Sequence, residues 1–370
     1  MSSAAEEPGR PADMVDWDLA VATARRLAPA GPVVEAAEAR AVVSDLRSFA
    51  AAAEDPVRTY TGLDGTSAPA PLVVVDRGGW SQANADGMRQ LIDPLVVKLR
   101  AARPAASSPL VDGVGPKITG VETGALLAFL SSKVLGQFDP FWSDGNGAAG
   151  RLLLVAPNVV HVERELGVDT RDFRLWVCLH EETHRVQFTA VPWLRDHLRG
   201  QVGEFVAATD VDPTVLFSRL RAVVEAVVDT ARGGGADGPS LIDLVQSPEQ
   251  KVVLDRITAL MSLLEGHADV VMDGVGPQVV PSVDEIRAKF QKRRQSSTGL
   301  DRTVRRLLGL EAKMRQYRDG AKFVRGVLGE VGMSGFNRVW ESPDTLPTLA
   351  EIAEPSTWVR RVHGQRAVTA

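Results

Sequence analysis

The stretch RDFRLWVCLHEETHRVQF, residues 171–188, decides the fold of this chain. It contains neither glycine nor proline, which predicts one continuous helix. In its first half, Phe173 and residues 175–179 are apolar on nearly every face of such a helix, which predicts that this half is buried. The second half carries the pattern H-E-x-x-H at residues 180–184. Because buried histidines need polar partners or a metal, this helix is predicted to carry the chemistry of the protein.

The two histidines of the pattern, His180 and His184, are four residues apart and therefore lie one turn apart on the same helix face. Their imidazole nitrogens can bind one Zn²⁺ ion. Glu181 follows the first histidine, so its carboxylate can take a proton from a zinc-bound water without occupying a ligand position. Composition predicts roughly 0.005 chance matches to this pattern in the whole chain. A zinc site is therefore favoured over a solvated helix face.

A catalytic zinc site needs a third protein ligand and one open position. The extended pattern H-E-x-x-H-x-x-G-x-x-H is excluded, because Gln187 and Ala190 stand where it requires glycine and histidine. A carboxylate from another helix remains, and the predicted helix 252–274 offers Glu265 directly after an apolar run. Asp269 lies four residues further on the same face, within reach of the free N–H of a ligand histidine. We expect Glu265 to be the third ligand and Asp269 to orient a ligand ring.

Two further residues are candidates for contacts with an oxyanion or with substrate. His267 is two residues from Glu265, so a straight helix points it about 200° away. Three roles are open to His267: ligand in place of Glu265, donor to the oxyanion, or ordinary core histidine. Tyr317 could stabilise an oxyanion or simply pack its ring. Cys178 is predicted to be a small buried apolar residue.

Composition limits the classes of partner. Hydrophobic residues make up 44% and charged residues 24% of the 370 residues, and the net charge is −5. This balance gives no reason to expect nucleic acid or anionic lipid as a partner. The single cysteine excludes intramolecular disulfides and multi-cysteine metal sites. The N-terminus has acidic residues where a signal peptide has basic ones, and no apolar run reaches the ~18 residues of a membrane span. We expect a cytoplasmic protein; its oligomeric state is left open.

The predicted fold class is mainly α, or α+β with a small sheet, because helical patterns greatly outnumber strand patterns. Residues 1–13 are rich in Ser, Ala, Glu, Pro and Gly and are expected to form a disordered tail. Residues 14–370 are expected to form one domain. Within it, a helical lobe over 14–150 is a possible partner for a metal-binding part over 151–370.

The boundaries of the individual elements follow from glycines, prolines and apolar runs. Strands are predicted at 72–76 and 151–160, and Arg77-Gly78-Gly79 is predicted to be a turn. Loops are predicted at 104–116, 137–150 and 291–299. The predicted helices are 14–29, 33–54, 81–102, 118–136, 161–166, 171–188, 194–208, 213–232, 239–246, 248–273, 300–318 and 320–332, and the C-terminal part is expected to hold loops and short helices.

Several segments of the chain resemble the zincin-like metallopeptidase family, which is widespread in high-GC bacteria. The matching segments are LLLVAPNVV (152–160), FRLWVCLHEETHRVQF (173–188), VPWL (191–194), EGHADVVMD (265–273), RQYRDG (315–320) and GFNRVW (335–340). H-E-x-x-H is shared by many families, whereas its combination with EGHAD and RQYRDG is much more specific.

This resemblance implies a mostly helical zincin-like fold with His180, Glu181 and His184 in the roles given above. The spacing of Glu265 and Asp269 is similar to the E-x-x-x-D element of Glu-ligand zincins, although Leu264 and Ala268 replace the usual Asn and Ser. Members of the family are labelled hydrolases without a defined substrate, and some are associated with deazaflavin-coenzyme biosynthesis.

The sequence thus predicts a zinc-dependent hydrolase, in particular a peptidase, with Zn²⁺ held by His180, His184 and Glu265 and with Glu181 as general base. Its substrate would be a peptide or a small-molecule amide. One alternative is a non-catalytic protein that keeps the zincin fold and binds a partner or a small molecule; another is a metal-dependent amidase that acts on a metabolite. The intact Glu181 argues against the first alternative, because a structural zinc site needs no base. Cleft shape would separate a peptide from a metabolite.

Overall fold

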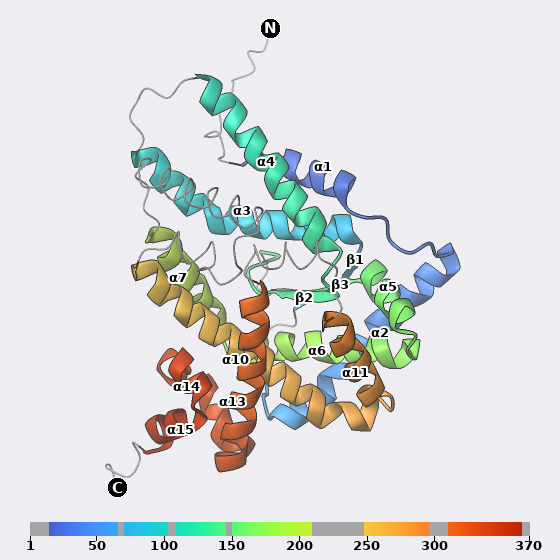
Figure 1. Ribbon diagram of the computed structural model, residues 1–370, viewed down its shortest axis with the longest axis vertical. Helices are drawn as coiled ribbons and strands as arrows, with labels where there is room; N and C mark the ends of the chain where they lie inside the picture. Colours follow the sequence, from blue (N-terminus) through green and yellow to red (C-terminus); the bar gives the residue numbers. More distant parts are fainter. Residues whose placement is uncertain are drawn as a thin grey trace, which may run out of the picture.

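The computed structural model describes residues 15–65, 70–102, 109–145, 150–208, 248–295 and 310–364, with only the backbone of 92–102, 109–114, 206, 294–295 and 310–318. Most of these residues are helical (Figure 1). The α-helices are α1 (Trp17–Leu27), α2 (Ala36–Thr61), α3 (Arg77–Ala102), α4 (Pro109–Ser131), α5 (Ala156–Leu166), α6 (Thr170–Ala190), α7 (Leu194–Ala207), α10 (Pro248–Val279), α11 (Val283–Gln295), α13 (Leu310–Phe336), α14 (Leu349–Ala353) and α15 (Pro355–His363). Two short 3₁₀ helices, η1 (Asn337–Trp340) and η2 (Pro343–Thr345), follow α13.

A three-stranded sheet lies among these helices. Its strands are β1 (Leu72–Val75), β2 (Gly136–Asp139) and β3 (Arg151–Val155), in the order β1-β3-β2. β3 is central, parallel to β1 and antiparallel to β2. The predicted fold class, mainly α with a small sheet, is confirmed.

The sheet separates two hydrophobic clusters, because side chains alternate along β3. Leu153 and Val155 pack into a cluster with residues of α1, α3 and α4. Leu152 and Leu154 face the larger cluster, which includes α2, α6, α10 and α13. Figure 1 shows this arrangement, with α3 and α4 on one side of the sheet and α6 and α10 on the other. Helix α6 is therefore held in the centre of the molecule.

Helix α6 is fixed at its N-terminal half by charge as well as by apolar packing. Asp169 caps the helix, since its carboxylate accepts a hydrogen bond from the Asp172 N–H at 2.9 Å. The buried Arg174 donates to both oxygens of Glu163 on α5, at 2.6 and 2.9 Å, and to Asp45 on α2, at 2.7 Å. These bonds join three helices and prevent α6 from turning about its axis.

Helices α10 and α13 cross in very close contact, through glycines on both. A Cβ atom on Gly266 would lie 2.5 Å from the carbonyl oxygen of Gly320, and one on Gly320 would collide with the carbonyl of Ser262. Real Cβ atoms essentially never approach another atom closer than 3.0 Å. The backbones of the two helices therefore touch one residue after Glu265, which lets α13 set the position of that carboxylate.

Helix α6, predicted over 171–188, is confirmed with small changes of its ends, as are the strand at 72–76 and the helix at 194–208. Other predicted boundaries were wrong, and proline explains two of them. The predicted strand 151–160 ends at Val155 because Pro157 lies in the first turn of α5, a position that proline favours. The predicted loop 104–116 gives way to helix at Pro109, where α4 begins.

Local hydrogen bonding and close packing explain the other differences. Residues 77–79 are the first turn of α3, not a separate turn, because the Asp76 carboxylate accepts a hydrogen bond from the Gly79 N–H at 2.6 Å and so caps the helix. Gly274 was expected to end its helix, but α10 continues to Val279. Glycine stands here because a side chain at this position would collide with Tyr60. Three further boundaries differ: α2 continues past Pro56 to Thr61, β2 replaces part of a predicted loop, and α11 reaches residue 295. In α13 the helices predicted to end at 318 and to begin at 320 join without a break, and the predicted end at 332 coincides with a kink at the non-helical Gly332.

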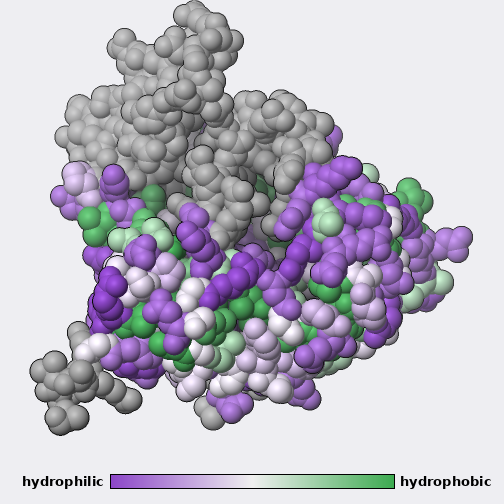
Figure 2. All heavy atoms as spheres, turned by 60° about the horizontal axis from the view of Figure 1, so that its bottom comes forward, coloured by the Kyte–Doolittle hydropathy of each residue, from purple (hydrophilic) through white to green (hydrophobic). Residues whose placement is uncertain are grey.

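Three predictions fall on residues outside those described: the tail 1–13 and the helices 213–232 and 239–246. Among the described helices, none combines the length and the apolar character required to cross a membrane. Figure 2 shows a face on which polar side chains surround smaller groups of hydrophobic ones. The large exposed hydrophobic residues of the described chain include Ile118 and Val121, which are three residues apart on α4, and, elsewhere, Leu27, Val33, Val73 and Val252.

Candidate metal centre

Helices α6 and α10 bring His180, His184 and Glu265 together. The Nε2 atom of His180 lies 3.7 Å from one carboxylate oxygen of Glu265, and the Nε2 atom of His184 lies 3.8 Å from the other. One ligand atom from each of the three residues can be chosen so that all lie within 4.8 Å of one another. The two rings are 4.9 Å apart and perpendicular, as expected for residues one helical turn apart.

This geometry fits a zinc ion. Tetrahedral bonds of about 2.0–2.1 Å to zinc place two ligand atoms about 3.3 Å apart. The observed separations from the two imidazoles to the carboxylate are only a few tenths of an ångström longer. The side chains keep 25%, 12% and 24% of their surface exposed, in the order His180, His184 and Glu265. Solvent therefore reaches the site, as a site with an open fourth position requires.

Glu181 lies beside this group of ligands and against the sheet. It is buried, and burial raises the pKa of its carboxyl well above the usual value, with a further contribution from the negative charge of Glu265. A Cβ atom on Gly136, the first residue of β2, would lie 2.5 Å from Glu181 Cγ and 2.9 Å from Glu181 Oε1. The absence of a side chain at Gly136 thus makes room for the Glu181 carboxyl.

His267 lies behind the metal ligands rather than beside them. Its ring has no exposed surface, stacks on Phe336 and meets Trp340 edge-on. Burial, with a smaller contribution from His184, lowers the pKa of His267 to about 3, so the ring is neutral. Its Nδ1 atom is 2.9 Å from the side-chain nitrogen of Gln187. A ring so enclosed has no surface to offer a substrate in this conformation, which favours the core role.

The remaining candidates are placed differently. Asp269 is exposed on α10, where its charge raises the pKa of the Arg287 guanidinium against the larger lowering effect of burial. Its proposed action on a ligand histidine stays a prediction. Tyr317 lies in α13, but its side chain is outside the described residues. Cys178 is fully buried, as predicted, and burial raises the pKa of its thiol.

Sequence reasoning missed four residues that contact or support the site. Gln187 entered only as a departure from the extended histidine pattern, and Gly136 lay in a predicted helix end. Gly266 and Gly320 belong to the segments EGHAD and RQYRDG, and each makes room for the backbone of the other helix where α10 and α13 cross. Each of the two segments contains one glycine within a predicted helix or at its end, and this pair is the signal that could have pointed to the crossing.

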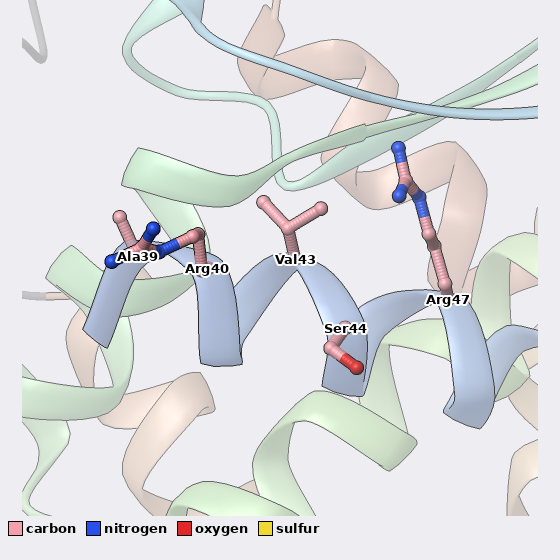
Figure 3. A pocket seen from close by; sticks show the side chains of 5 residues that line it. All are labelled: Ala39, Arg40, Val43, Ser44 and Arg47. Carbon is pink, nitrogen blue, oxygen red and sulfur yellow. The ribbon is translucent and has the colours of Figure 1, made fainter. Parts of the chain in front are cut away.

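A hollow of about 380 Å³ lies elsewhere, on α2 (Figure 3). Its lining residues are Ala39, Arg40, Val43, Ser44 and Arg47. They all come from one helix, and none belongs to the metal-ligand group. The hollow is therefore separate from the candidate metal centre.

Comparisons with known proteins point to a family and to a solved structure. A family model described as zincin-like metallopeptidase matches residues 15–359. A crystal structure from Chloroflexus aurantiacus, described as a candidate hydrolase with a novel fold, is 32% identical to this chain and superimposes with a TM-score of 0.67. The match covers 94% of this chain and 99% of that one. No curated protein matches. The resemblance noted from the sequence is confirmed.

Proposed function

Because the chain belongs to the zincin-like metallopeptidase family, we propose that it is a zinc-dependent hydrolase whose substrates are peptides. The observation that carries this proposal is the group His180, His184 and Glu265, whose ligand atoms lie within 4.8 Å of one another with Glu181 beside them. The family implies a metal, and the donor set of two imidazoles and one carboxylate is typical of catalytic zinc.

Each ligand has a defined part in the proposed site. His180 and His184 would bind through Nε2, the atoms that face Glu265, and Glu265 would bind through its carboxylate. A zinc ion held there would polarise a substrate carbonyl and lower the pKa of a bound water. Since two neutral imidazoles and one carboxylate leave a net positive charge on such a centre, the site would attract the oxygen of a carbonyl group.

Glu181 would move the proton. The three ligands are sufficient to hold the metal, so Glu181 is free to act as a base. Its carboxyl is near enough to Glu265 for the two charges to interact. A carboxylate oxygen of Glu181 would accept a proton from the attacking water. Glu181 would then pass this proton to the nitrogen of the leaving amine. A protein that only stored zinc or bound a partner would gain nothing from a carboxyl in this place.

Strand β2 favours a peptide as substrate over a small metabolite. In the described part of the sheet, β2 is an edge strand that pairs with β3 alone. Its first residue, Gly136, touches Glu181. An extended peptide can add to such an edge through backbone hydrogen bonds. A peptide bound along β2 would therefore run past the general base.

The test is cleavage of a mixed peptide library by wild-type protein, by protein stripped with a chelator, and by stripped protein with zinc restored. We expect cleavage only with zinc. Glu181→Gln should keep its zinc and lose about 10²–10⁴-fold in rate. Glu182→Gln is the matched control, because the Glu182 carboxylate is buried on the same helix but pairs with Arg185 at 2.8 Å. A zinc-loaded protein that cleaves no peptide would contradict the choice of substrate, and cleavage by zinc-loaded Glu181→Gln at the wild-type rate would contradict the mechanism.

A further inference from the structure

We propose that Gln187 is a positioning residue that holds His184 ready to bind metal through Nε2, and that the backbone of Leu264 and the ring of His267 hold Gln187 in turn. The proposal rests on the proposed function, since it takes His184 as a metal ligand. It assigns a purpose to Gln187, which stands where the extended histidine pattern would need glycine.

The carbonyl of Leu264 fixes the direction of the Gln187 amide. The side-chain nitrogen of Gln187 lies 3.0 Å from this oxygen and 2.9 Å from His267 Nδ1. A backbone carbonyl can only accept a hydrogen bond, so the group that faces it must be the NH₂ of the amide. The opposite orientation would place two oxygens against each other in a site where Gln187 has no exposed surface. The amide oxygen must therefore face the other way.

That oxygen faces His184, at 2.9 Å from its Nδ1 atom. An amide oxygen can only accept, so His184 must carry its proton on Nδ1. A neutral imidazole has one protonated nitrogen, which leaves the Nε2 of His184 with a free lone pair. Nε2 is the atom that lies 3.8 Å from the Glu265 carboxylate. The hydrogen bonds thus select the tautomer that can bind metal at this place.

His267 completes the arrangement from the other side. Its Nδ1 accepts the second N–H of the Gln187 amide, so this ring carries its proton on Nε2. Contacts with Phe336 and Trp340, at ring separations of 5.3 and 5.6 Å, prevent the ring from turning. His267 therefore contributes to the metal centre through Gln187, without touching metal or substrate. Both partners of the amide nitrogen belong to α10, which also carries Glu265. This relay of hydrogen bonds, from Leu264 and His267 through Gln187, links the orientation of His184 to the helix that supplies the third ligand.

The experiment compares Gln187→Leu, which removes the amide and keeps an apolar side chain, with the control Thr183→Val. Thr183 is also fully buried on α6, but its hydroxyl donates only to Leu179 of the same helix. Zinc affinity is measured by competition with a chelator. The tautomer of His184 is read from nitrogen–proton correlation spectra of metal-free protein labelled with ¹⁵N in its six histidines, above the usual histidine pKa of about 6.5. The spectrum of His184→Ala identifies the signals.

We expect metal-free wild type to carry the His184 proton on Nδ1. In Gln187→Leu the proton should move at least partly to Nε2, and zinc affinity should fall about ten- to hundredfold. An unchanged tautomer, or an affinity within about twofold of Thr183→Val, would overturn the proposal. If Gln187→Leu does not fold, the wild-type spectrum still decides, because a proton on Nε2 there overturns the relay. A wild type with the proton on Nδ1 that binds no zinc would instead overturn the proposed function.

Discussion

The contact between Gly266 and Gly320 predicts that Gly266→Ala will damage the metal centre without touching a ligand. A Cβ atom on Gly266 would lie 2.5 Å from the Gly320 carbonyl oxygen and closer still to the neighbouring backbone atoms. Ordinary contact begins at 3.4 Å. These obstacles are backbone atoms of a packed helix, so no flexible side chain can move aside. The nearest of them, the carbonyl carbon of Gly320, would lie only 2.1 Å away, so helices α10 and α13 must separate by about 1.3 Å at this point.

The expected cost follows from this displacement. Overpacking of a core by one methyl group costs about 1–3 kcal/mol, and the better helix propensity of alanine returns about 0.5–1 kcal/mol. Since the obstacles are backbone atoms, the cost should lie at the upper end of its range, and we expect a net loss of about 2–2.5 kcal/mol in the free energy of unfolding. Glu265 precedes the substituted residue, and functional groups must be held within about 0.5 Å of their productive positions. Zinc affinity should therefore fall at least tenfold.

Two measurements check this prediction: urea unfolding of the metal-free protein, and zinc affinity by chelator competition. Gly329→Ala is the matched control, because Gly329 lies in α13, the partner helix of the crossing, and a Cβ atom there would meet nothing within 4 Å. That variant should be as stable as wild type or slightly more stable, with unchanged zinc affinity. If Gly266→Ala behaves in the same way as Gly329→Ala, the reasoning about the helix crossing is refuted.

Two other substitutions separate function from stability. Gly136→Ala should displace the buried Glu181 side chain, because the new Cβ atom would lie 2.5 Å from Glu181 Cγ, and should slow peptide cleavage about tenfold with unchanged zinc content; loss of zinc would contradict this. Glu351→Gln should cost about 1–3 kcal/mol near pH 7. Burial alone would raise the pKa of Glu351, but hydrogen bonds from Arg361 and Thr348 more than offset it and lower the pKa. The stability from this carboxylate is therefore present above its unfolded-state pKa and lost as the pH falls through the lowered one, so the difference between variant and wild type in urea unfolding should shrink in acid.

Much of the centre could be predicted because its signals are local. Helix α6 follows from an unbroken run without glycine or proline, and the four-residue spacing of His180 and His184 puts their side chains on one face. Glu265 was found because it follows an apolar run on a helix that had to be buried. In each case the pattern within one helix is enough to say which side chains face the same way.

The rest of the fold depends on contacts between segments that are far apart in the chain. Gly274 suggested a helix end, whereas its actual partner is Tyr60 on α2. The tautomer of His184 depends on Gln187 and on Leu264, which is 77 residues further along the chain. Such pairs carry no local pattern, because a glycine that makes room and a glycine that ends a helix are the same letter.

The zinc content of the purified protein tests the proposed centre most directly. Elemental analysis should find about one zinc per chain in wild type and in Glu181→Gln, because this variant keeps all three ligands. It should find none in His184→Ala or Glu265→Ala, because each of these removes a ligand. Unfolding curves of the variants show whether each is folded. A wild-type protein that takes up no zinc even after reconstitution would contradict the centre, and retention of zinc by Glu265→Ala would contradict the assignment of its third ligand.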